Sequence, residues 1–245
     1  MKAMILAAGL GTRLRPLTDT RPKALVEING RTLLEITLTR LHAFGVTEVI
    51  VNVHHFADLV VDYIKSHNHF GMRVEISRED DLLLDTGGGL KKASWFFLDN
   101  SPNSSPEPFL LHNVDVISTI DLRRMLQFHD EHNALATLAV QTRESSRLLL
   151  FNDKNQLVGR AAPDSPLATS HSPLPLAFSG IHILSPRLLP MLTEEGVFSI
   201  IDAYVRLASQ GEKILAFRAD EYYWRDLGRP ADLQQAAHDL QKKGL

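Results

Sequence analysis

Short, mostly apolar runs recur along the first half of the chain, and between them apolar residues return every three or four positions. The runs lie at residues 2–7, 48–53, 72–77 and 108–112. Unbroken apolar runs of this length are typical of strands buried on both faces of a parallel sheet. Helical spacing of apolar residues in 32–44 and 59–64 predicts crossover helices. The alternation predicts a parallel α/β sheet with right-handed crossovers.

The second half of the chain adds further strands to this pattern. A strand is expected at residues 134–141, and a hairpin is expected across Asn152-Asp153-Lys154-Asn155. Other expected elements are strands at 24–28, 147–151, 156–159, 176–184 and 213–218, and helices around residues 122–129, 201–208 and 233–240. Two proline-rich polar stretches, 101–108 and 161–175, predict exposed loops. We expect one α/β domain spanning residues 1–245.

The segment after the first strand combines glycines, prolines and cations. It reads AAGLGTRLRPLTDTRPK at residues 7–23. Glycines let backbone N–H groups approach a ligand closely, and a loop after a strand presents several such groups to an anion. The pattern predicts a polyphosphate cradle, with a glycine-rich surface turn as the alternative. The spacing fits neither a P-loop nor a Rossmann fingerprint, because Leu14 and Pro16 stand where a helix would have to start.

Two later segments complete the candidate chemistry. Asp85-Thr86-Gly87-Gly88-Gly89 precedes an expected helix at residues 90–97 and predicts either a second surface of backbone N–H groups or a flexible tether. Asp115 ends a buried strand, where it is expected to face the ligand crevice as a Mg²⁺ ligand or to cap the following helix. Asp121 is an equally good cap.

Composition narrows the function classes. The chain has 245 residues, a net charge of −3 and no cysteine, so thiolate catalysis and cysteine zinc sites are excluded. The charge gives no reason to expect nucleic acid as a partner. No apolar stretch approaches the ~20 residues of a membrane span, and we expect a cytoplasmic protein. His129 and His132 lack further nearby ligands, so the histidines are interpreted as structural.

Four motifs stand in order: AAGLGTRLRPLT with PK, then DTGGG, then NVD at 113–115, then WRDLG at 224–228. Together they resemble the sugar-phosphate nucleotidyltransferases, the nucleoside-diphosphate-sugar pyrophosphorylases, over nearly the whole chain. Within that family the chain is most similar to the bacterial MurNAc-1-phosphate uridylyltransferases of cell-wall recycling, with mannose-1-phosphate guanylyltransferases close behind. Two positions depart from the family pattern: Val114 replaces a glycine, and Arg160 stands in the region of a Glu-Lys-Pro motif.

The resemblance implies a three-layer, Rossmann-like sandwich of the nucleotidyltransferase (GT-A-like) type with a mixed, mainly parallel sheet. It also implies that an NTP and a sugar 1-phosphate give a nucleotide sugar and pyrophosphate, with Mg²⁺ as cofactor. The implied residues are Asp115 and Asp226 for the metal; Arg13, Gly11 and Thr12 for the β- and γ-phosphates; Lys23 between the α-phosphate and the sugar phosphate; Ala7, Gly9, Thr86, Gly87 and Gly88 for the nucleotide and its base; and Asn113, Ser179 and Gly180 for the sugar.

Three other readings stay open at this stage. A cytidylyltransferase acting on a non-sugar phosphate would share the same core, a nucleotide-sugar sensor would lack turnover, and a Rossmann oxidoreductase is the most distant. Uridine is favoured because glycine backbone at 87–89 would lie close to a small base, whereas guanine would need an acceptor such as Asp85 or Glu79. We expect a monomer or homodimer without a membrane partner.

Overall fold

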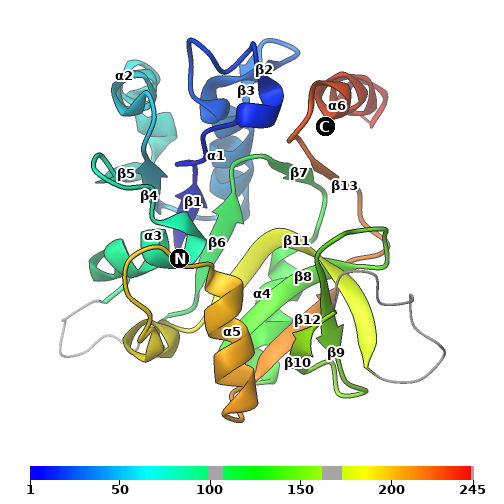
Figure 1. The fold of residues 1–245 in the computed structure, drawn as a ribbon. Helices are drawn as coiled ribbons and strands as arrows, with labels where there is room; N and C mark the ends of the chain where they lie inside the picture. The colour runs from blue at the N-terminus through cyan, green and yellow to red at the C-terminus, as the bar shows by residue number, and fades with distance from the viewer. Residues whose placement is uncertain (99–106, 162–172, 244–245) are drawn as a thin grey trace.

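The computed structural model describes residues 1–98, 107–161 and 173–243 (Figure 1). The loops expected at 101–108 and 161–175 fall largely outside these residues. The main sheet has nine strands: β1 Lys2–Leu6, β4 Glu48–Val53, β5 Arg73–Arg78, β6 Phe109–Asn113, β8 Ala136–Gln141, β9 Leu148–Phe151, β10 Leu157–Arg160, β11 Leu174–Leu184 and β12 Ile214–Arg218. Two two-stranded ribbons pair β2 Glu27–Ile28 with β3 Arg31–Thr32, and β7 Val116–Ser118 with β13 Trp224–Asp226.

The sheet is mixed, as the family resemblance implies. Strands β6, β1, β4 and β5 run parallel in that spatial order, and β12 runs parallel to β8. Strand β11 lies antiparallel to β6, β8 and β9, and joins the N-terminal parallel part to the later strands. The pairing of β11 with β8 shifts register between Phe178 and His182, around Gly180 at φ 74°. Gly180 therefore marks a change of register within one long strand.

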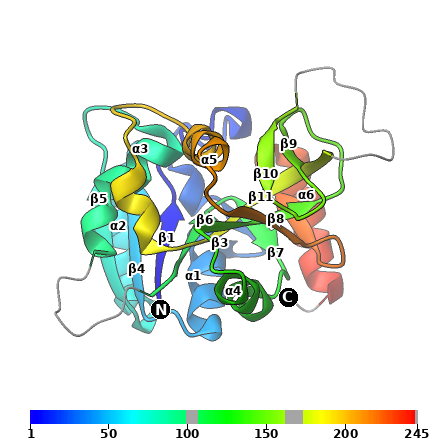
Figure 2. The same cartoon turned by 90° about the horizontal axis from the view of Figure 1, so that it is seen from below.

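Helices cover both faces of the sheet (Figure 2). Side chains of α1 Leu33–Phe44, α2 Ala57–Ser66, α4 Leu122–Glu131 and α6 Pro230–Lys243 join the core on one face, and those of α3 Asp85–Lys92 and α5 Ile200–Ser209 join the core on the other. Successive side chains of strand β1 point to opposite faces of the sheet, so Ala3 and Ile5 join the core on the first face and Met4 joins the core on the second. Short 3₁₀ turns lie at Thr12–Leu14, Lys23–Leu25, Asn68–Gly71, Ser94–Phe96 and Pro186–Met191. In the described ranges, no helix combines the length and apolar character needed to cross a bilayer.

Helix ends follow the capping signals in the sequence. Thr32 caps α1 by accepting a hydrogen bond from the Glu35 N–H at 3.1 Å, and Gly45 ends the helix at φ 104°. Asp121 caps α4 by accepting from the N–H groups of residues 123 and 124. Because Asp121 is the cap, Asp115 is left for another role.

Two local expectations are wrong. The segment expected as a strand at 24–28 contains a 3₁₀ turn and only the two-residue strand β2. The Gly87-Gly88-Gly89 run lies inside α3 rather than before a helix, and the helix ends at Lys92. A Cβ on Gly87 would lie 2.3 Å from the Phe198 ring, and one on Gly88 would lie 2.4 Å from the carbonyl oxygen of Gly196. Close packing of α3 on the segment before α5 therefore accounts for glycines whose helix propensity is low.

Three histidines are buried in the core. Burial, followed by the charge of a nearby group, lowers the pKa of His112 and His182 to about 3 and that of His129 to about 4. His129 contacts the Thr137 hydroxyl at 3.0 Å, and His182 contacts the Tyr204 hydroxyl at 2.8 Å. All three are therefore neutral at pH 7 in the fold.

We expect the free energy of unfolding to fall as pH drops below 6.5. The unfolded histidines bind protons near pH 6.5, whereas the folded ones do so only near pH 3 to 4. Their stabilising contribution is therefore complete above pH 6.5 and is lost below it, by up to about 1.4 kcal/mol per histidine per pH unit. Denaturant unfolding between pH 7.5 and 5 measures this slope. His129→Gln should reduce the slope, the exposed His132→Gln should not, and a flat profile would contradict the expectation.

Candidate functional site

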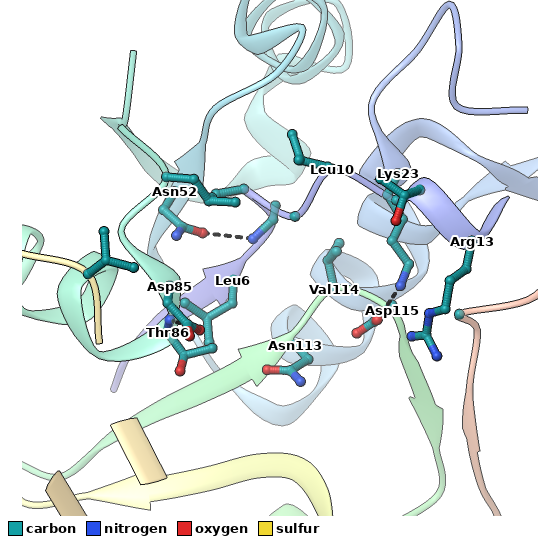
Figure 3. Close-up of a pocket in the computed structure, with 18 residues that line it drawn as sticks. Leu6, Leu10, Arg13, Lys23, Asn52, Asp85, Thr86, Asn113, Val114 and Asp115 are labelled. Carbon is teal, nitrogen blue, oxygen red and sulfur yellow. Dashed lines mark hydrogen bonds and ion pairs between the residues drawn. The ribbon is translucent and has the colours of Figure 1, made fainter. Parts of the chain in front are cut away.

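A cavity of about 520 Å³ opens at the carboxyl ends of β1, β4 and β6, the edge at which parallel sheets bind ligands. Figure 3 shows Lys23, Arg13 and Asp115 together on one side of this cavity and Asn52, Asp85 and Thr86 on the other. The lining residues are Leu6, Ala7, Ala8, Gly9, Leu10, Gly11, Thr12, Arg13, Lys23, Asn52, Leu83, Asp85, Thr86, Asn113, Val114, Asp115, Val197 and Gly228.

The loop after β1 forms one wall. Gly11 has φ 64°, and a Cβ there would lie 2.9 Å from the Thr18 methyl group, so the turn requires glycine. The Thr18 hydroxyl donates to the Gly11 carbonyl at 2.9 Å and holds the loop closed from behind. In the described part of the chain, no acceptor takes the backbone N–H groups of Leu10, Gly11 and Thr12. These free donors on the cavity wall suit an anionic ligand.

Two carboxylates and two cations meet on one side of the cavity, where Figure 3 shows Lys23, Arg13 and Asp115. The Lys23 ammonium donates to Oδ2 of Asp115, and both side chains are largely buried. The ribbon of β7 and β13 brings Asp226 opposite Val116, and the Leu227 N–H donates to the Asp115 carbonyl at 2.8 Å. Asp115 and Asp226, distant in sequence, are thus held together by backbone pairing.

One carboxylate oxygen of Asp226, Oδ1, is buried without a hydrogen-bond partner among the described residues. Burial, then the negative charge of Asp115, raises the pKa of Asp226, while Lys23 and Arg13 oppose this shift. A Cβ on Gly228 would lie 2.5 Å from Arg13 Nη2 and 2.8 Å from that same Oδ1 atom, which explains the glycine of the WRDLG motif.

This donor set fits a hard divalent cation. Mg²⁺ is usually held by one or two carboxylates together with substrate phosphates and water. Asp115 and Asp226 supply two carboxylates, one with an unpartnered buried oxygen. No group of three or more metal-binding side chains occurs in residues 1–98, 107–161 and 173–243, so a cage made wholly by these residues is not available.

A buried polar pair stiffens the strand end that carries Asp115. Arg40 donates to the Ile120 carbonyl at 2.6 Å and contacts His112 Nε2 at 3.3 Å. Since arginine only donates, His112 accepts at Nε2 and donates from Nδ1 to the Asn113 carbonyl at 2.7 Å. Burial lowers the pKa of Arg40 to about 10, so it stays charged at neutral pH. These hydrogen bonds to the carbonyls of Asn113 and Ile120 hold the backbone on both sides of Asp115.

The opposite wall is organised by Asn52 at the end of β4. Its Oδ1 accepts from the Ala7 N–H at 2.7 Å, and its amide donates to Glu79 at 2.7 Å. The second Glu79 oxygen accepts from the Leu84 N–H at 2.9 Å, so both oxygens of this buried side chain are used within the fold. Asp85 lies on the cavity wall beside Thr86, and its Oδ1 accepts a hydrogen bond from the Thr86 N–H at 2.6 Å. Of the two acceptors expected near a base, only Asp85 faces the cavity.

The structure brings most of the predicted residues to this cavity. Those that line it are Ala7, Gly9, Gly11, Thr12, Arg13, Lys23, Thr86, Asn113 and Asp115. Asp226 lies beside it, against Gly228. Gly87, Gly88, Ser179 and Gly180 do not line it: the first two are packed inside α3, and the last two lie behind Asn113.

Sequence reasoning did not single out several lining residues, among them Leu6, Ala8, Leu10, Asn52, Leu83 and Val197. Asn52 had a usable signal, because it is a polar residue inside the apolar run at 48–53 and ends a parallel strand at the same edge as Asp115. Val197 had none, since it comes from the segment before α5, and only the packing of that segment on α3 brings it to the cavity.

Comparisons with known proteins agree with this geometry. A family model described as "Nucleotidyl transferase" matches residues 2–152. The chain is 34% identical to an N-acetylmuramate alpha-1-phosphate uridylyltransferase of Caulobacter vibrioides over 93% of this chain and 92% of that protein. It is 28% identical to a UTP–glucose-1-phosphate uridylyltransferase of Synechocystis, over 96% of this chain but 62% of that longer protein. A crystal structure of UDP-glucose pyrophosphorylase complexed with UDP-glucose superposes with a TM-score of 0.79 at 19% identity, covering 99% of this chain and 98% of that one.

Proposed function

The chain belongs to the nucleotidyl transferase family, and from this premise we propose that it transfers a uridylyl group from UTP to a sugar 1-phosphate, releasing pyrophosphate. One observation supports this most strongly. The cavity wall joins free backbone N–H groups, two cations and Asp115, with Asp226 behind them. Such a wall suits two phosphorylated substrates.

The reaction needs positioning more than proton transfer. A phosphate oxygen of the sugar 1-phosphate attacks the α-phosphorus, and the bond from that phosphorus to the oxygen bridging the β-phosphate breaks. The second pKa of a phosphate monoester is about 6, so the attacking oxygen is already ionised at neutral pH and requires no general base. The difficulty is the mutual repulsion of two polyanions, which fixed positive charge and oriented N–H groups overcome.

Each cation has a distinct part in this proposal. Arg13, with the N–H groups of Gly11 and Thr12, holds the β- and γ-phosphates and stabilises the departing pyrophosphate. Lys23 lies beside Asp115 and bridges the α-phosphate and the incoming sugar phosphate. Arg13 can grip two phosphate oxygens at once, whereas Lys23 makes a point contact.

Asp115 and Asp226 are the residues that would hold Mg²⁺. When bound, such an ion would supply positive charge that offsets the repulsion between the two phosphorylated substrates. Its binding would also satisfy the buried oxygen of Asp226 and relieve the repulsion that raises the pKa of this residue. The arrangement of the two aspartates therefore supports a divalent metal ion as cofactor, and we propose that this ion is Mg²⁺.

The base and sugar are assigned on different grounds. The expected contact of a base with bare glycine backbone no longer applies, because Gly87 and Gly88 are buried within α3. Uridine rests instead on the similarity to the Caulobacter enzyme, which also suggests N-acetylmuramate 1-phosphate as the acceptor. Asp85 on the cavity wall keeps guanylyl transfer to mannose 1-phosphate as the alternative, since its carboxylate could accept from guanine. Asn113 is the sugar-side residue that reaches the cavity.

We also propose that residues 1–245 work as one nucleotidyltransferase domain, as a monomer or homodimer. The support is that a single sheet carries the loop after β1 and the strand that ends at Asn113. The ribbon that joins Asp115 to Asp226 links this part of the chain to the segment before α6.

A competition assay tests the assignment of substrates. Equal concentrations of UTP and GTP, each with N-acetylmuramate, glucose and mannose 1-phosphates and Mg²⁺, are followed by pyrophosphate release and mass spectrometry. We expect UDP-N-acetylmuramate as the main product. Preference for GTP with mannose 1-phosphate would replace the substrate assignment but retain the catalytic one, and no pyrophosphate release from any pair would contradict both.

A further inference from the structure

Arg143 follows β8 and is a half-buried cation that the function described so far does not use. Its guanidinium carbon lies 3.8 Å from the centroid of the Trp224 ring, and Nη2 donates to the Phe178 carbonyl at 2.7 Å. Its Nε is buried and has no hydrogen-bond partner among the described residues. Nor does any carboxylate in those residues form an ion pair with it, although the charge of Asp226 acts on it from a longer distance.

Contacts connect Arg143 to the sugar side of the site. Trp224 begins the strand that ends at Asp226, and its indole N–H donates to the Ser179 carbonyl at 2.7 Å. The next residue, Gly180, comes so close to Asn113 that a Cβ there would lie 2.8 Å from the Asn113 amide nitrogen. Asn113 lines the cavity, and contacts through Gly180, Ser179 and Trp224 link it to Arg143. The base side, with Asp85 and Thr86, is on the opposite wall (Figure 3).

The environment of Arg143 favours an anion. Burial lowers the pKa of Arg143, and the charge of Asp226 partly opposes this shift, yet a guanidinium stays protonated at neutral pH. A partly desolvated cation that has no direct ion pair is costly, and proteins usually pair it. The stack on Trp224 holds the guanidinium plane, and a planar fork of donors matches a carboxylate.

We propose that Arg143 is a specificity-determining residue that binds a carboxylate on the acceptor sugar. This inference rests on the proposed sugar-1-phosphate transfer. Arg13 and Lys23 on the cavity wall already serve the phosphates, so the anion left for Arg143 is one on the sugar itself. N-acetylmuramate carries such a group on its lactyl ether, whereas glucose, mannose and N-acetylglucosamine do not. The acceptor is therefore an acidic sugar.

Two substrates that differ only in the lactyl group give the test. We expect Arg143→Gln to raise the KM for N-acetylmuramate 1-phosphate about 10- to 100-fold, the usual effect of losing a hydrogen bond to a charged group. The KM values for UTP and N-acetylglucosamine 1-phosphate should stay within twofold of wild type. Arg143→Lys, which keeps the charge, should recover part of the loss. Arg147→Gln, at an exposed arginine four residues further on, is the matched control and should change nothing.

Direct binding separates this inference from the proposed function. Calorimetric titration of the UTP-bound protein with each sugar 1-phosphate, using an α,β-non-hydrolysable UTP analogue, reads the contact without turnover. Weaker binding of the acidic sugar alone in Arg143→Gln supports the inference even if turnover requires another base. An equal loss for both sugars would assign Arg143 to the phosphate or to the fold, and no loss for either would also overturn it. If Arg143→Gln does not fold, the same comparison with Arg143→Lys decides, because its shorter side chain should weaken only the acidic sugar.

Discussion

Asp226→Asn is expected to lower turnover by about a hundredfold or more while the protein gains or keeps its stability. Removing one charge-stabilising group from an active site typically costs ~3 kcal/mol of barrier, and 1.4 kcal/mol corresponds to a factor of ten. The folded protein should not suffer, because Oδ1 of Asp226 has no hydrogen bond to lose. Burial and the neighbouring Asp115 charge raise the pKa of Asp226, so the fold disfavours its ionised form and the neutral amide removes that penalty.

Asp115→Asn should lower turnover as steeply but reduce stability. Asp115 is the ion-pair partner of Lys23, and its removal leaves a buried ammonium with a weaker acceptor. Steady-state rates at saturating Mg²⁺ and thermal unfolding midpoints of both variants make the comparison, with the exposed Asp153→Asn as control. Wild-type rates in both variants would refute the metal assignment. Equal losses of stability would refute the account of the unsatisfied Asp226 oxygen.

The position of Asp115 was predictable from sequence for a physical reason. An unbroken apolar run in the sequence indicates a buried parallel strand, and the side chains directly after such a strand lie at the carboxyl edge of the sheet. The same rule located the loop at residues 7–13, and both reach the cavity. Asp226 came from the resemblance of WRDLG to a family motif, because nothing in its local pattern shows that β13 pairs with β7.

The glycine run at 87–89 shows where such rules stop. Glycine favours loops when only local propensity acts, and the sequence therefore predicted a loop. Position 87 of the helix requires glycine because Phe198 leaves no room for a side chain, and that contact spans more than a hundred residues of sequence. The choice between Asp85 and Glu79 as a free acceptor was undecidable for the same reason, since Asn52 and the Leu84 N–H engage Glu79 only in the folded chain.

Arg143 and Val114 give a related lesson. Val114 replaces a glycine of the family pattern, and its side chain is buried while the residue lines the cavity. Arg160, which stands in the region of the family's Glu-Lys-Pro motif, pairs with Asp202 on α5 at 2.6 Å. Unpaired charge cannot be recognised from sequence, because pairing depends on which elements come together. Arg143 stands out only after its neighbours are known.

Replacing Lys23 should affect both substrates, whereas replacing Arg13 should mainly affect the NTP. Lys23→Met keeps most of the buried aliphatic side chain but removes the ammonium group that pairs with Asp115. Asp115 and Asp226 are then left to repel each other. We expect kcat to fall about 100- to 1000-fold, in the range for loss of one transition-state donor, together with a lower unfolding midpoint. Arg13→Met should raise the KM for UTP and leave the KM for the sugar 1-phosphate nearly unchanged.

The variant Arg13→Lys tests whether Arg13 makes a bidentate contact with phosphate or acts only through its charge. Arg13→Lys keeps the positive charge but cannot make two parallel hydrogen bonds to phosphate oxygens, so it should recover only part of the lost UTP affinity. Full activity in Arg13→Lys would contradict the bidentate contact. A double-mutant cycle of Lys23→Met with Asp115→Asn separates the ion pair from catalysis. Stability should be less than additively reduced, because the second change removes the charge that the first leaves unpaired. Turnover should stay at or below that of the worse single variant, since the two residues act on the same phosphates.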